Sequence, residues 1–201
     1  MNNGDVRMAT SARETIMQSI RSHLAASAPH NGPEIPIRFH PSSSVSPSVE
    51  EFKRQLEAVD GHCIIAANEI EVEAAVTRIT EKKRIATSDA PPATKDLFNY
   101  DVGITKAQAG IAETGTLVLD SAVEHNRLVS LVPPVHIALL DASKIYGTLG
   151  ETLAALQNTG NELSPAITFI TGPSRTADIE LTLAIGVHGP KELYVIINQN
   201  A

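Results

Sequence analysis

One carboxylate and two threonines flank a glycine in the segment 113–116, which stands directly before an apolar run. An enclosed carboxylate has a raised pKa, so Glu113 is a candidate acid, base or nucleophile. The neighbouring hydroxyls and the glycine backbone are groups able to bind a ligand. The alternative role is structural, with the Glu113 carboxylate accepting hydrogen bonds from backbone N–H groups and holding its turn. We predict Glu113 as the catalytic candidate, and as ligand-binding residues Thr114, Gly115 and Thr116.

A second turn, near the C-terminus, carries Ser174, Arg175 and Thr176 between a predicted strand and a predicted helix. A helix N-terminus leaves backbone N–H groups free, and an arginine binds a carboxylate through two parallel hydrogen bonds. We therefore predict all three residues as ligand-binding. Asp178 and Glu180 follow closely and would oppose a bound dianion, which favours a carboxylate or a neutral sugar over a phosphate. The alternative is an ordinary turn and cap, in which Asp178 complements the helix dipole.

Three more side chains are candidate ligand-binding residues. Arg127 follows a polar loop and could clamp a carboxylate, or it could equally pair with Glu124 at the surface. His136 begins an apolar strand after two prolines, where a hydrogen-bonded core histidine is the alternative. His188 stands on a glycine-flanked loop close in sequence to the second turn. The sequence contains no string typical of a metal or nucleotide site, so we predict no metal.

Predicted helices and predicted strands alternate along the chain from residue 48 onward, and they position these candidate residues. Capping boxes and helical spacing predict helices or helical turns at 48–59, 68–80, 93–98, 106–109, 148 onward and 176–183. Apolar runs predict strands at 62–67, 83–87, 102–104, 116–119, 127–132, 136–140, 166–171 and 192–197. Three of these strands follow one another between residues 116 and 140 with short connections, which predicts an antiparallel insertion or extension.

This alternation predicts an α/β fold with a mainly parallel sheet flanked by helices. Ligands of such sheets collect at the carboxyl ends of the strands. We therefore expect the Glu113–Thr116 turn and the Ser174–Thr176 loop to line one cavity, with His188 near its rim.

The N-terminal residues form a separate region in this interpretation. Residues 10–26 have the spacing of an amphipathic helix, and residues 27–48 hold five prolines and a serine cluster. Such a segment stays extended and buries little apolar surface. We predict an N-terminal helix and a Pro/Ser-rich strap over residues 1–47, and the α/β domain over residues 48–201.

Composition excludes several classes of protein. A formal net charge of −7 and only 3% aromatic residues argue against nucleic acid and anionic membranes as partners. No stretch has the length and hydropathy of a membrane span, and no secretory signal is evident, so we expect a cytoplasmic protein. The single cysteine, Cys63, rules out an iron–sulfur cluster held by four cysteines of this chain. Cys63 itself has the setting of a buried hydrophobe rather than of a nucleophile.

Three long strings carry a resemblance to a known family: GIAETGTLVLDS at 110–121, RLVSLVPPVHIALL at 127–140, and TGPSRTADIELTLAIGVHGP at 171–190. Together they resemble the LUD domain of lactate utilisation proteins, in particular the protein C branch with its short N-terminal extension. The resemblance runs from about Phe52 to Ile197. It implies a fold similar to the superfamily of ribose-phosphate isomerases, glucosamine-phosphate deaminases and CoA transferases.

The resemblance also implies a biological setting. It points to a component of a multi-protein system that oxidises L-lactate to pyruvate, in which this chain is auxiliary and the iron–sulfur clusters belong to partner subunits. The sequence carries no dinucleotide fingerprint or cysteine cluster, so we expect no cofactor on this chain. The alternative is a stand-alone isomerase or acyl/CoA-transferase-like enzyme acting on a small carboxylate or sugar phosphate. Convergence of Glu113, Arg175 and His188 would favour this enzyme, and their scattering would favour the auxiliary component.

Overall fold

The computed structural model describes residues 3–26, 48–124, 126–157, 166–176, 184–186 and 188–200. The chain divides into two compact units, Met1–Phe39 and His40–Ala201. The predicted boundary after residue 47 falls next to residues 27–47, which lie outside the described part, so that boundary stays a prediction. No helix among the described residues is long and apolar enough to cross a membrane.

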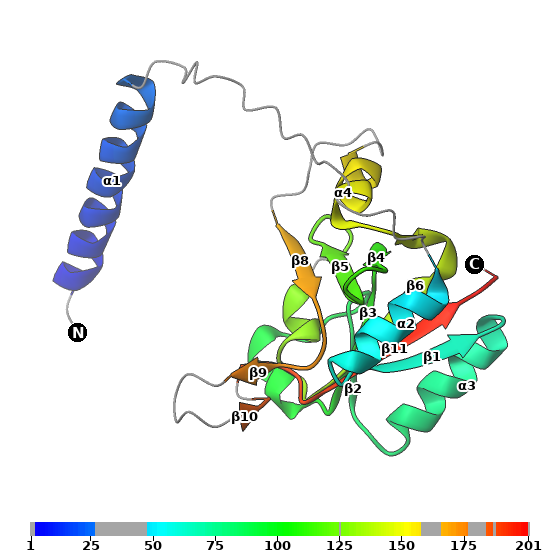
Figure 1. The fold of residues 1–201 in the computed structure, drawn as a ribbon. Coiled ribbons are helices and arrows are strands. Elements are labelled where there is room, and N and C mark those ends of the chain that lie inside the picture. The colour runs from blue at the N-terminus through cyan, green and yellow to red at the C-terminus, as the bar shows by residue number, and fades with distance from the viewer. Residues whose placement is uncertain are drawn as a thin grey trace. The chain divides into compact units, whose positions relative to one another are not determined.

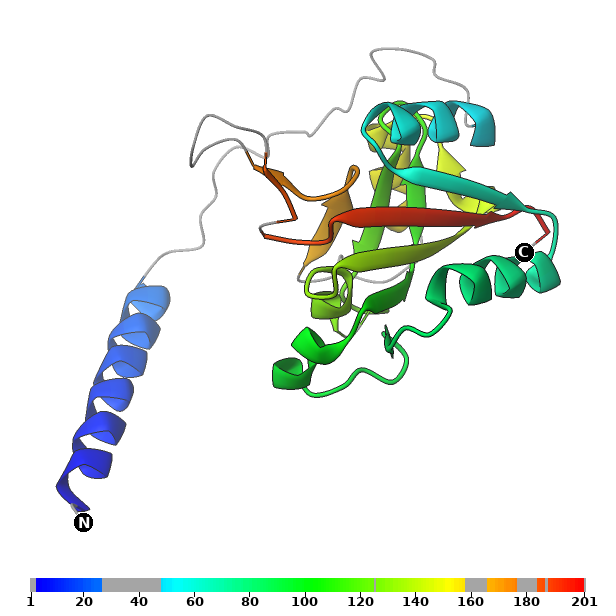
Figure 2. The same ribbon diagram turned by 90° about the horizontal axis from the view of Figure 1, so that it is seen from below.

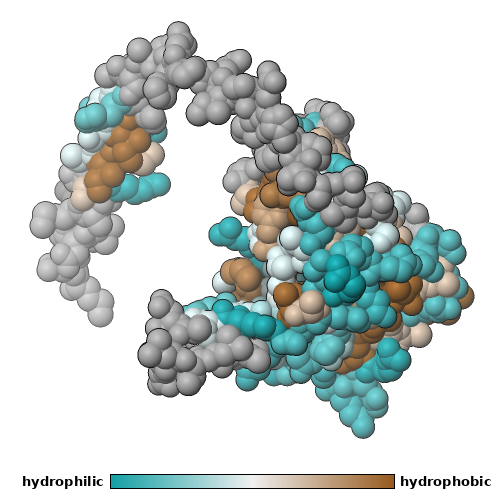
Figure 3. Space-filling view, viewed as in Figure 1, coloured by the Kyte–Doolittle hydropathy of each residue, from teal (hydrophilic) through white to brown (hydrophobic). Residues whose placement is uncertain are grey.

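The first unit is described by its helix α1, Asn3–Ala26, which starts earlier than the predicted residue 10. The spacing that predicted this helix places apolar side chains along one stripe, visible in Figure 3. Ile16, Met17 and Ile20 on this stripe are 60%, 40% and 48% exposed. The helix is therefore amphipathic as expected, and its apolar stripe is open to solvent.

The second unit is built on a five-stranded sheet (Figure 1). All four strand pairings in it are parallel, so the predicted mainly parallel sheet is confirmed. Five short apolar runs of the sequence form these strands, as expected for a sheet that is buried on both faces. In spatial order the strands are β1 (His62–Ala66), β11 (Glu192–Asn198), β6 (Val135–Asp141), β3 (Val102–Lys106) and β2 (Ile85–Thr87).

Helices cover opposite faces of this sheet, as Figure 2 shows. Helix α2, Val49–Ala58, packs its buried Phe52 and Leu56 into one core with side chains of β6 and β11. Helix α3, Glu69–Thr80, packs Val72 and other apolar residues against the opposite face. The sheet thus separates two cores, and most of its central side chains are fully buried.

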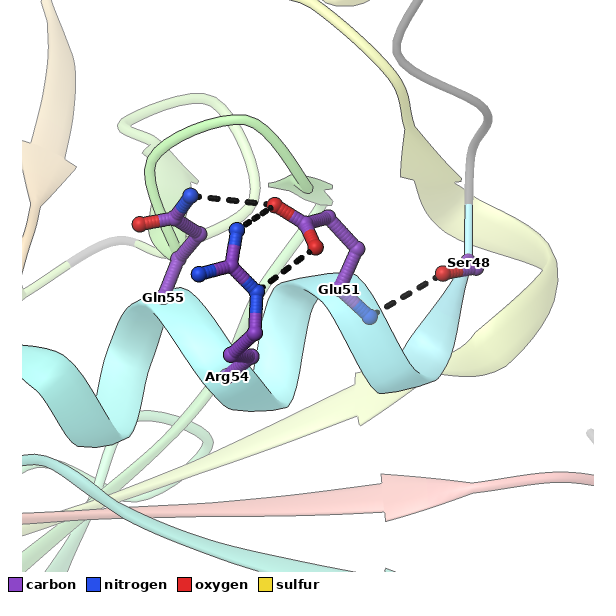
Figure 4. Close-up of polar contacts among 4 residues, drawn as sticks. All are labelled: Ser48, Glu51, Arg54 and Gln55. Atoms are coloured by element: carbon purple, nitrogen blue, oxygen red, sulfur yellow. Dashed lines mark hydrogen bonds and ion pairs between the residues drawn. The ribbon is translucent and has the colours of Figure 1, made fainter.

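The predicted caps of both helices form. Ser48 Oγ accepts a hydrogen bond from Glu51 N at 3.0 Å (Figure 4), and Asn68 Oδ1 accepts one from the third residue of α3. The Glu51 carboxylate accepts hydrogen bonds from Arg54 and Gln55 instead of completing the cap. The Arg54 hydrogen bond is the main reason that the pKa of Glu51 is lowered. Local sequence signals therefore determine where these helices begin.

The sequence predicted an antiparallel extension from three successive strands between residues 116 and 140, but 136–140 is β6 of the parallel sheet and only 116–119 lies in a sheet with antiparallel pairings. This second sheet takes its other strands from elsewhere in the chain. Its β4–β5 and β5–β8 pairings are antiparallel, and its β4–β7 pairing is parallel. The α2 side of the parallel sheet packs against this sheet through Leu117 and Leu119 of β5. Helix α4, Leu149–Gln157, packs on its outer side. The strands are, in spatial order, β7 (Ile145–Tyr146), β4 (Ala109–Ile111), β5 (Thr116–Asp120) and β8 (Ile167–Ile170).

The prediction of a strand over residues 127–132 is wrong. Arg127–Ser130 is a 3-10 helix, η2, because two local side-chain bonds compete with strand pairing. Asn126 Oδ1 accepts from Leu128 N at 3.1 Å, and Ser130 Oγ donates to the Arg127 carbonyl at 2.7 Å. The helix covers the sheet instead of joining it, and Gly103 of β3 leaves the necessary room. A Cβ atom on that glycine would lie 1.9 Å from a carbonyl oxygen of η2.

Two smaller predictions also need correction, and one short helix lies where no element was predicted. Residues 106–109 are no helical turn, since β3 ends at Lys106 and β4 begins at Ala109. The helix predicted at 93–98 is instead the 3-10 helix η1, Thr94–Asn99. A third 3-10 helix, η3, covers Ala142–Lys144, where no element was predicted.

The helix predicted at 176–183 does not begin where expected. Arg175–Thr176 forms the short strand β9, which pairs antiparallel with β10, Ala184–Ile185. Gly186 N donates to the Ser174 carbonyl at 2.8 Å and extends this pairing. The remainder of the predicted helix, residues 177–183, lies outside the described residues. Among the described residues, the second turn is therefore held by a strand pair.

Candidate functional site

A cavity of about 290 Å³ lies at the amino ends of β6 and β11. His136 and Leu193, each the second residue of its strand, contribute to its wall. The predicted Ser174 and His188 also line it. Ser174 N donates to the Pro190 carbonyl at 2.9 Å, which brings the loops after β8 and before β11 together here. The site thus lies at the edge of the sheet opposite to the expected carboxyl ends.

His136 is the buried polar residue of this cavity. The residue is 1% exposed, its Nε2 lies 2.8 Å from Thr105 Oγ1, and its Nδ1 has no hydrogen-bond partner among the described residues. Burial lowers the pKa of His136 to about 4, because an imidazolium would lose its hydration in this apolar setting. The imidazole is therefore neutral at pH 7. The alternative was a core histidine with both ring nitrogens hydrogen-bonded, and here only Nε2 has a partner among the described residues.

Ser174 and His188 add two polar groups whose side chains form no hydrogen bond with the described residues. The Ser174 side chain is half-buried, and His188 is exposed. Gly189 brings the two loops close, because a Cβ atom there would lie 3.0 Å from Ser174 Cβ. The cavity therefore combines a buried imidazole and an accessible imidazole with hydroxyl-bearing residues, and such groups bind small polar ligands. The hydroxyl-bearing residues are Ser130, Thr168, Thr171 and Ser174.

The Glu113–Thr116 segment, here called the glycine-threonine motif, does not line this cavity but is connected to it by a chain of hydroxyl contacts. Thr114 Oγ1 lies 2.7 Å from Thr116 Oγ1, which in turn lies 2.7 Å from Thr171 Oγ1. Thr171 lines the cavity, whereas Thr114 and Thr116 do not. Three hydroxyls thus connect the first motif to the loop of the second.

Glu113 lies away from the cavity. Its Oε1 accepts a hydrogen bond of 2.9 Å from Leu149 N, the first residue of α4, and its own N–H donates to the Gly147 carbonyl. The carboxylate therefore satisfies one of the N–H groups that the helix start leaves free. The expectation that Glu113 and Ser174 line one cavity is wrong, because the Glu113 side chain turns toward α4. A catalytic role for Glu113 stays a prediction.

Gly115 packs against α2. Its φ is 63°, and a Cβ atom there would lie 2.3 Å from Leu56 N of that helix. Gly172 of the second motif is similar, with φ of 101° and 2.9 Å from its Cβ position to the Val59 carbonyl. Both motifs therefore need glycine for close contact with the end of α2. This packing role is sufficient to explain both residues.

Arg175 faces a second, more open hollow of about 730 Å³. Its guanidinium forms an ion pair with the exposed Asp60 and donates to the Val59 carbonyl at 2.9 Å. Cys63 also lines this hollow, and burial raises the pKa of its thiol to about 11, so the thiolate is not populated at neutral pH. Arg175 and Ser174 therefore line two different hollows, although they are adjacent in sequence.

The other two predicted binding residues lie elsewhere. Arg127 is exposed on η2 and does not line the cavity, although Ser130 of the same element does. Thr176 is half-buried in β9 and does not line it either. Sequence reasoning missed Thr105 and Ser130. Thr105 had a detectable signal, since it is a polar residue at an inward position of an apolar strand.

A third hollow, of about 760 Å³, occupies the carboxyl edge where the site was expected. Lys106, Asp141 and Lys144 lie around it, with an ion pair between Asp141 and Lys144. Most of its other surface is apolar and comes from α3 and the strand ends. Across the described residues, no three His, Cys, Asp or Glu side chains are grouped as metal ligands.

The parallel sheet with helices on both faces, and the mixed sheet packed beside it, define an α/β protein. Residues 88–198 match the family model of the LUD domain. This match covers more than half of the chain, and the protein belongs to the LUD domain family.

Several curated relatives are similar in sequence. Lactate utilization protein C of an Exiguobacterium species is 34% identical over 148 residues, covering 71% of this chain and 64% of that protein. Lactate utilization protein C of Bacillus subtilis is 40% identical over 102 residues, covering 49% and 42%. An uncharacterized protein of Neisseria meningitidis is 46% identical over 103 residues, covering 51% and 44%. The chain spans about half the length of these relatives.

One solved structure has a similar fold. The crystal structure of a DUF162 family protein from Deinococcus radiodurans aligns with a TM-score of 0.57 and 22% sequence identity. The alignment covers 75% of this chain and 95% of that protein. The two proteins therefore share their α/β architecture.

Proposed function

We propose that this protein is a cytoplasmic component of a system that oxidises L-lactate to pyruvate, and that it acts there as an auxiliary subunit without its own redox centre. The names of the relatives support the lactate setting. The single cysteine supports the assignment of iron–sulfur clusters to partner subunits, because such clusters are commonly held by four cysteine thiolates.

The observation that carries the auxiliary role is the separation of Glu113, Arg175 and His188. The first binds the start of α4, the second binds Asp60 and Val59, and only the third lines the cavity. An isomerase or acyl transferase needs its nucleophile, its base and its anion-binding group around one reacting atom. Since these candidates face different parts of the surface, they favour a subunit that binds partners over a stand-alone enzyme.

Growth of a deletion strain tests this proposal. Cells lacking the protein should grow poorly on L-lactate and normally on glucose, and the wild-type gene supplied in trans should restore growth. Normal growth of the deletion strain on L-lactate, with no second copy of the gene, would refute the proposal.

A second assay tests the auxiliary role. The purified chain should not reduce an electron-accepting dye with L-lactate, whereas the assembly isolated from lactate-grown cells should do so. The isolated assembly should also contain this chain together with iron–sulfur subunits. Lactate-dependent dye reduction by the chain alone, at the rate of the assembly, would show that the chain is the dehydrogenase itself.

A further inference from the structure

We infer that the cavity bordered by His136, Ser174 and His188 binds a small monocarboxylate that carries a hydroxyl or oxo group on the neighbouring carbon. The choice of this acid class rests on the proposed function. The existence of a binding site rests on the cavity itself.

The first argument is the polar group that the fold leaves without a partner. His136 lines the cavity, and its Nδ1 is buried without a hydrogen-bond partner in the described part of the chain. Leaving a buried polar atom unpaired costs about 1–3 kcal/mol, so proteins rarely keep one without a reason. Thr105 holds the opposite nitrogen of the ring. When the Thr105 hydroxyl donates to Nε2, Nδ1 carries the proton and becomes a donor for a ligand oxygen.

The second argument is that other polar side chains share the cavity with His136. Ser174 and His188 line the same cavity, and neither side chain forms a hydrogen bond with the described residues. A hydroxyl can donate and accept, and each imidazole offers a donor. Three groups with open hydrogen-bonding capacity match a ligand that presents several oxygens within a few ångströms.

Charge and size select the class of ligand. None of the described residues around this cavity is Lys, Arg, Asp or Glu. A phosphate dianion would therefore lack neutralising charge, whereas a monoanion carries less charge and can be held by the hydrogen bonds that the polar side chains of the cavity offer. The volume of about 290 Å³ is at the lower limit for small-molecule sites. Ile170 and Leu193 supply an apolar wall for a short alkyl group.

Titration calorimetry with the full-length protein tests this inference. L-Lactate and pyruvate should bind saturably, and inorganic phosphate and glycerol should bind at least about tenfold more weakly. Ser174→Ala and His188→Ala should each weaken lactate binding by about tenfold, since each removes a hydrogen bond to a charged or polar oxygen. The matched control is His62→Ala, which removes an exposed histidine from the second hollow and should leave binding unchanged.

A second readout reports on His136 without mutating a buried residue. Bound carboxylate beside the ring should raise the pKa of His136 and move its NMR ring signals. Saturable binding of neither acid, or tighter binding of phosphate than of lactate, would overturn the inference. Binding that is unchanged in both Ser174→Ala and His188→Ala would place the ligand elsewhere and overturn it as well.

These outcomes are independent of the test of the proposed function. A growth defect of the deletion strain without any binding of lactate or pyruvate refutes the site and leaves the auxiliary role intact. Specific binding together with normal growth of the deletion strain on L-lactate keeps the site and refutes the role in lactate oxidation.

Discussion

Thr116 Oγ1 and Thr171 Oγ1 lie 2.7 Å apart and join two motifs that are 55 residues apart in sequence. The antiparallel pairing of β5 with β8, in which Leu117 lies opposite Ile170, brings these hydroxyls together. Thr116 is buried, and Thr171 stands at the cavity. The glycine-threonine motif therefore supports the loop that carries Ser174, and the two motifs act through one polar contact.

Replacing Thr116 with valine should lower the free energy of unfolding by about 1–2 kcal/mol. Valine has nearly the same side-chain shape as threonine but lacks the hydroxyl that lies between those of Thr114 and Thr171. Denaturant unfolding measures this loss. Thr114→Val is the matched control, and it should cost less, since Thr114 is exposed and its neighbours can bond to water. Equal losses in the two variants would show that the hydroxyl chain is not what stabilises this loop.

Replacing Glu113 with alanine should destabilise the protein by about 1 kcal/mol, because Leu149 N then loses its acceptor at the start of α4. Glu113→Gln keeps an amide oxygen at that place and should retain most of the stability. Thermal unfolding compares the two variants. Growth on L-lactate then distinguishes a structural role of Glu113 from a catalytic one. We expect a strain with Glu113→Gln to grow on L-lactate. A folded Glu113→Gln variant that fails to support growth would indicate catalysis by the carboxylate.

Both alanine and asparagine at Gly115 should destabilise the protein strongly, by about 3 kcal/mol or more. Asparagine tolerates a positive φ better than alanine does, but neither residue has room for its Cβ atom against the backbone of α2. Unfolding by denaturant, or loss of soluble expression, measures this effect. Near-normal stability of Gly115→Asn would mean that the φ angle, and not contact with α2, requires glycine there.

The burial of His136 should make stability depend on pH. Its pKa is about 4 in the folded protein, below the ordinary histidine value of 6.5 that the unfolded chain retains, so the unfolded chain binds more protons between these values. Stability should therefore fall as pH decreases from about 6.5 to 4, by at most roughly 3 kcal/mol from this residue.

Comparing the unfolding free energy of wild type and His136→Gln over this pH range isolates that contribution, because the variant lacks the titrating ring. The variant should be less pH-dependent between about pH 6.5 and 4. Parallel curves for the two proteins would show that His136 does not carry the dependence. His62→Gln serves as control, since that histidine is exposed.

Deleting the residues before Ser48 should leave the α/β domain folded. The α/β core is formed by residues from Phe52 onward, and the N-terminal residues belong largely to a separate compact unit. The truncated protein should show one cooperative thermal transition and keep its helix and strand content by circular dichroism. An unfolded truncated protein would mean that α1 is an integral part of the core.

The sequence by itself determined the parallel sheet and the starts of its helices. Apolar runs at 136–140 and 192–197 mark interior strands of the sheet, because a strand buried on both faces lacks polar alternation. The run at 62–67 also forms a strand, β1, but it lies at the edge of the sheet. Ser48 and Asn68 mark helix starts, because a cap depends on a side chain and an N–H group three residues away. The long ordered strings at 110–121, 127–140 and 171–190 likewise indicated the LUD domain family.

Tertiary structure decided which motif residues meet. The sequence placed Glu113 and Ser174 in turns, but the direction of each side chain depends on what packs nearby: α4 for Glu113, and the loop before β11 for Ser174. The strand predicted at 127–132 is wrong for a different reason: a covering segment and a strand can share the same apolar composition, and local hydrogen bonds of Asn126 and Ser130 favour the 3-10 helix η2. Turns depend on neighbouring residues and can be predicted from the sequence, whereas the cavity around His136 is formed by contacts between segments far apart in the chain.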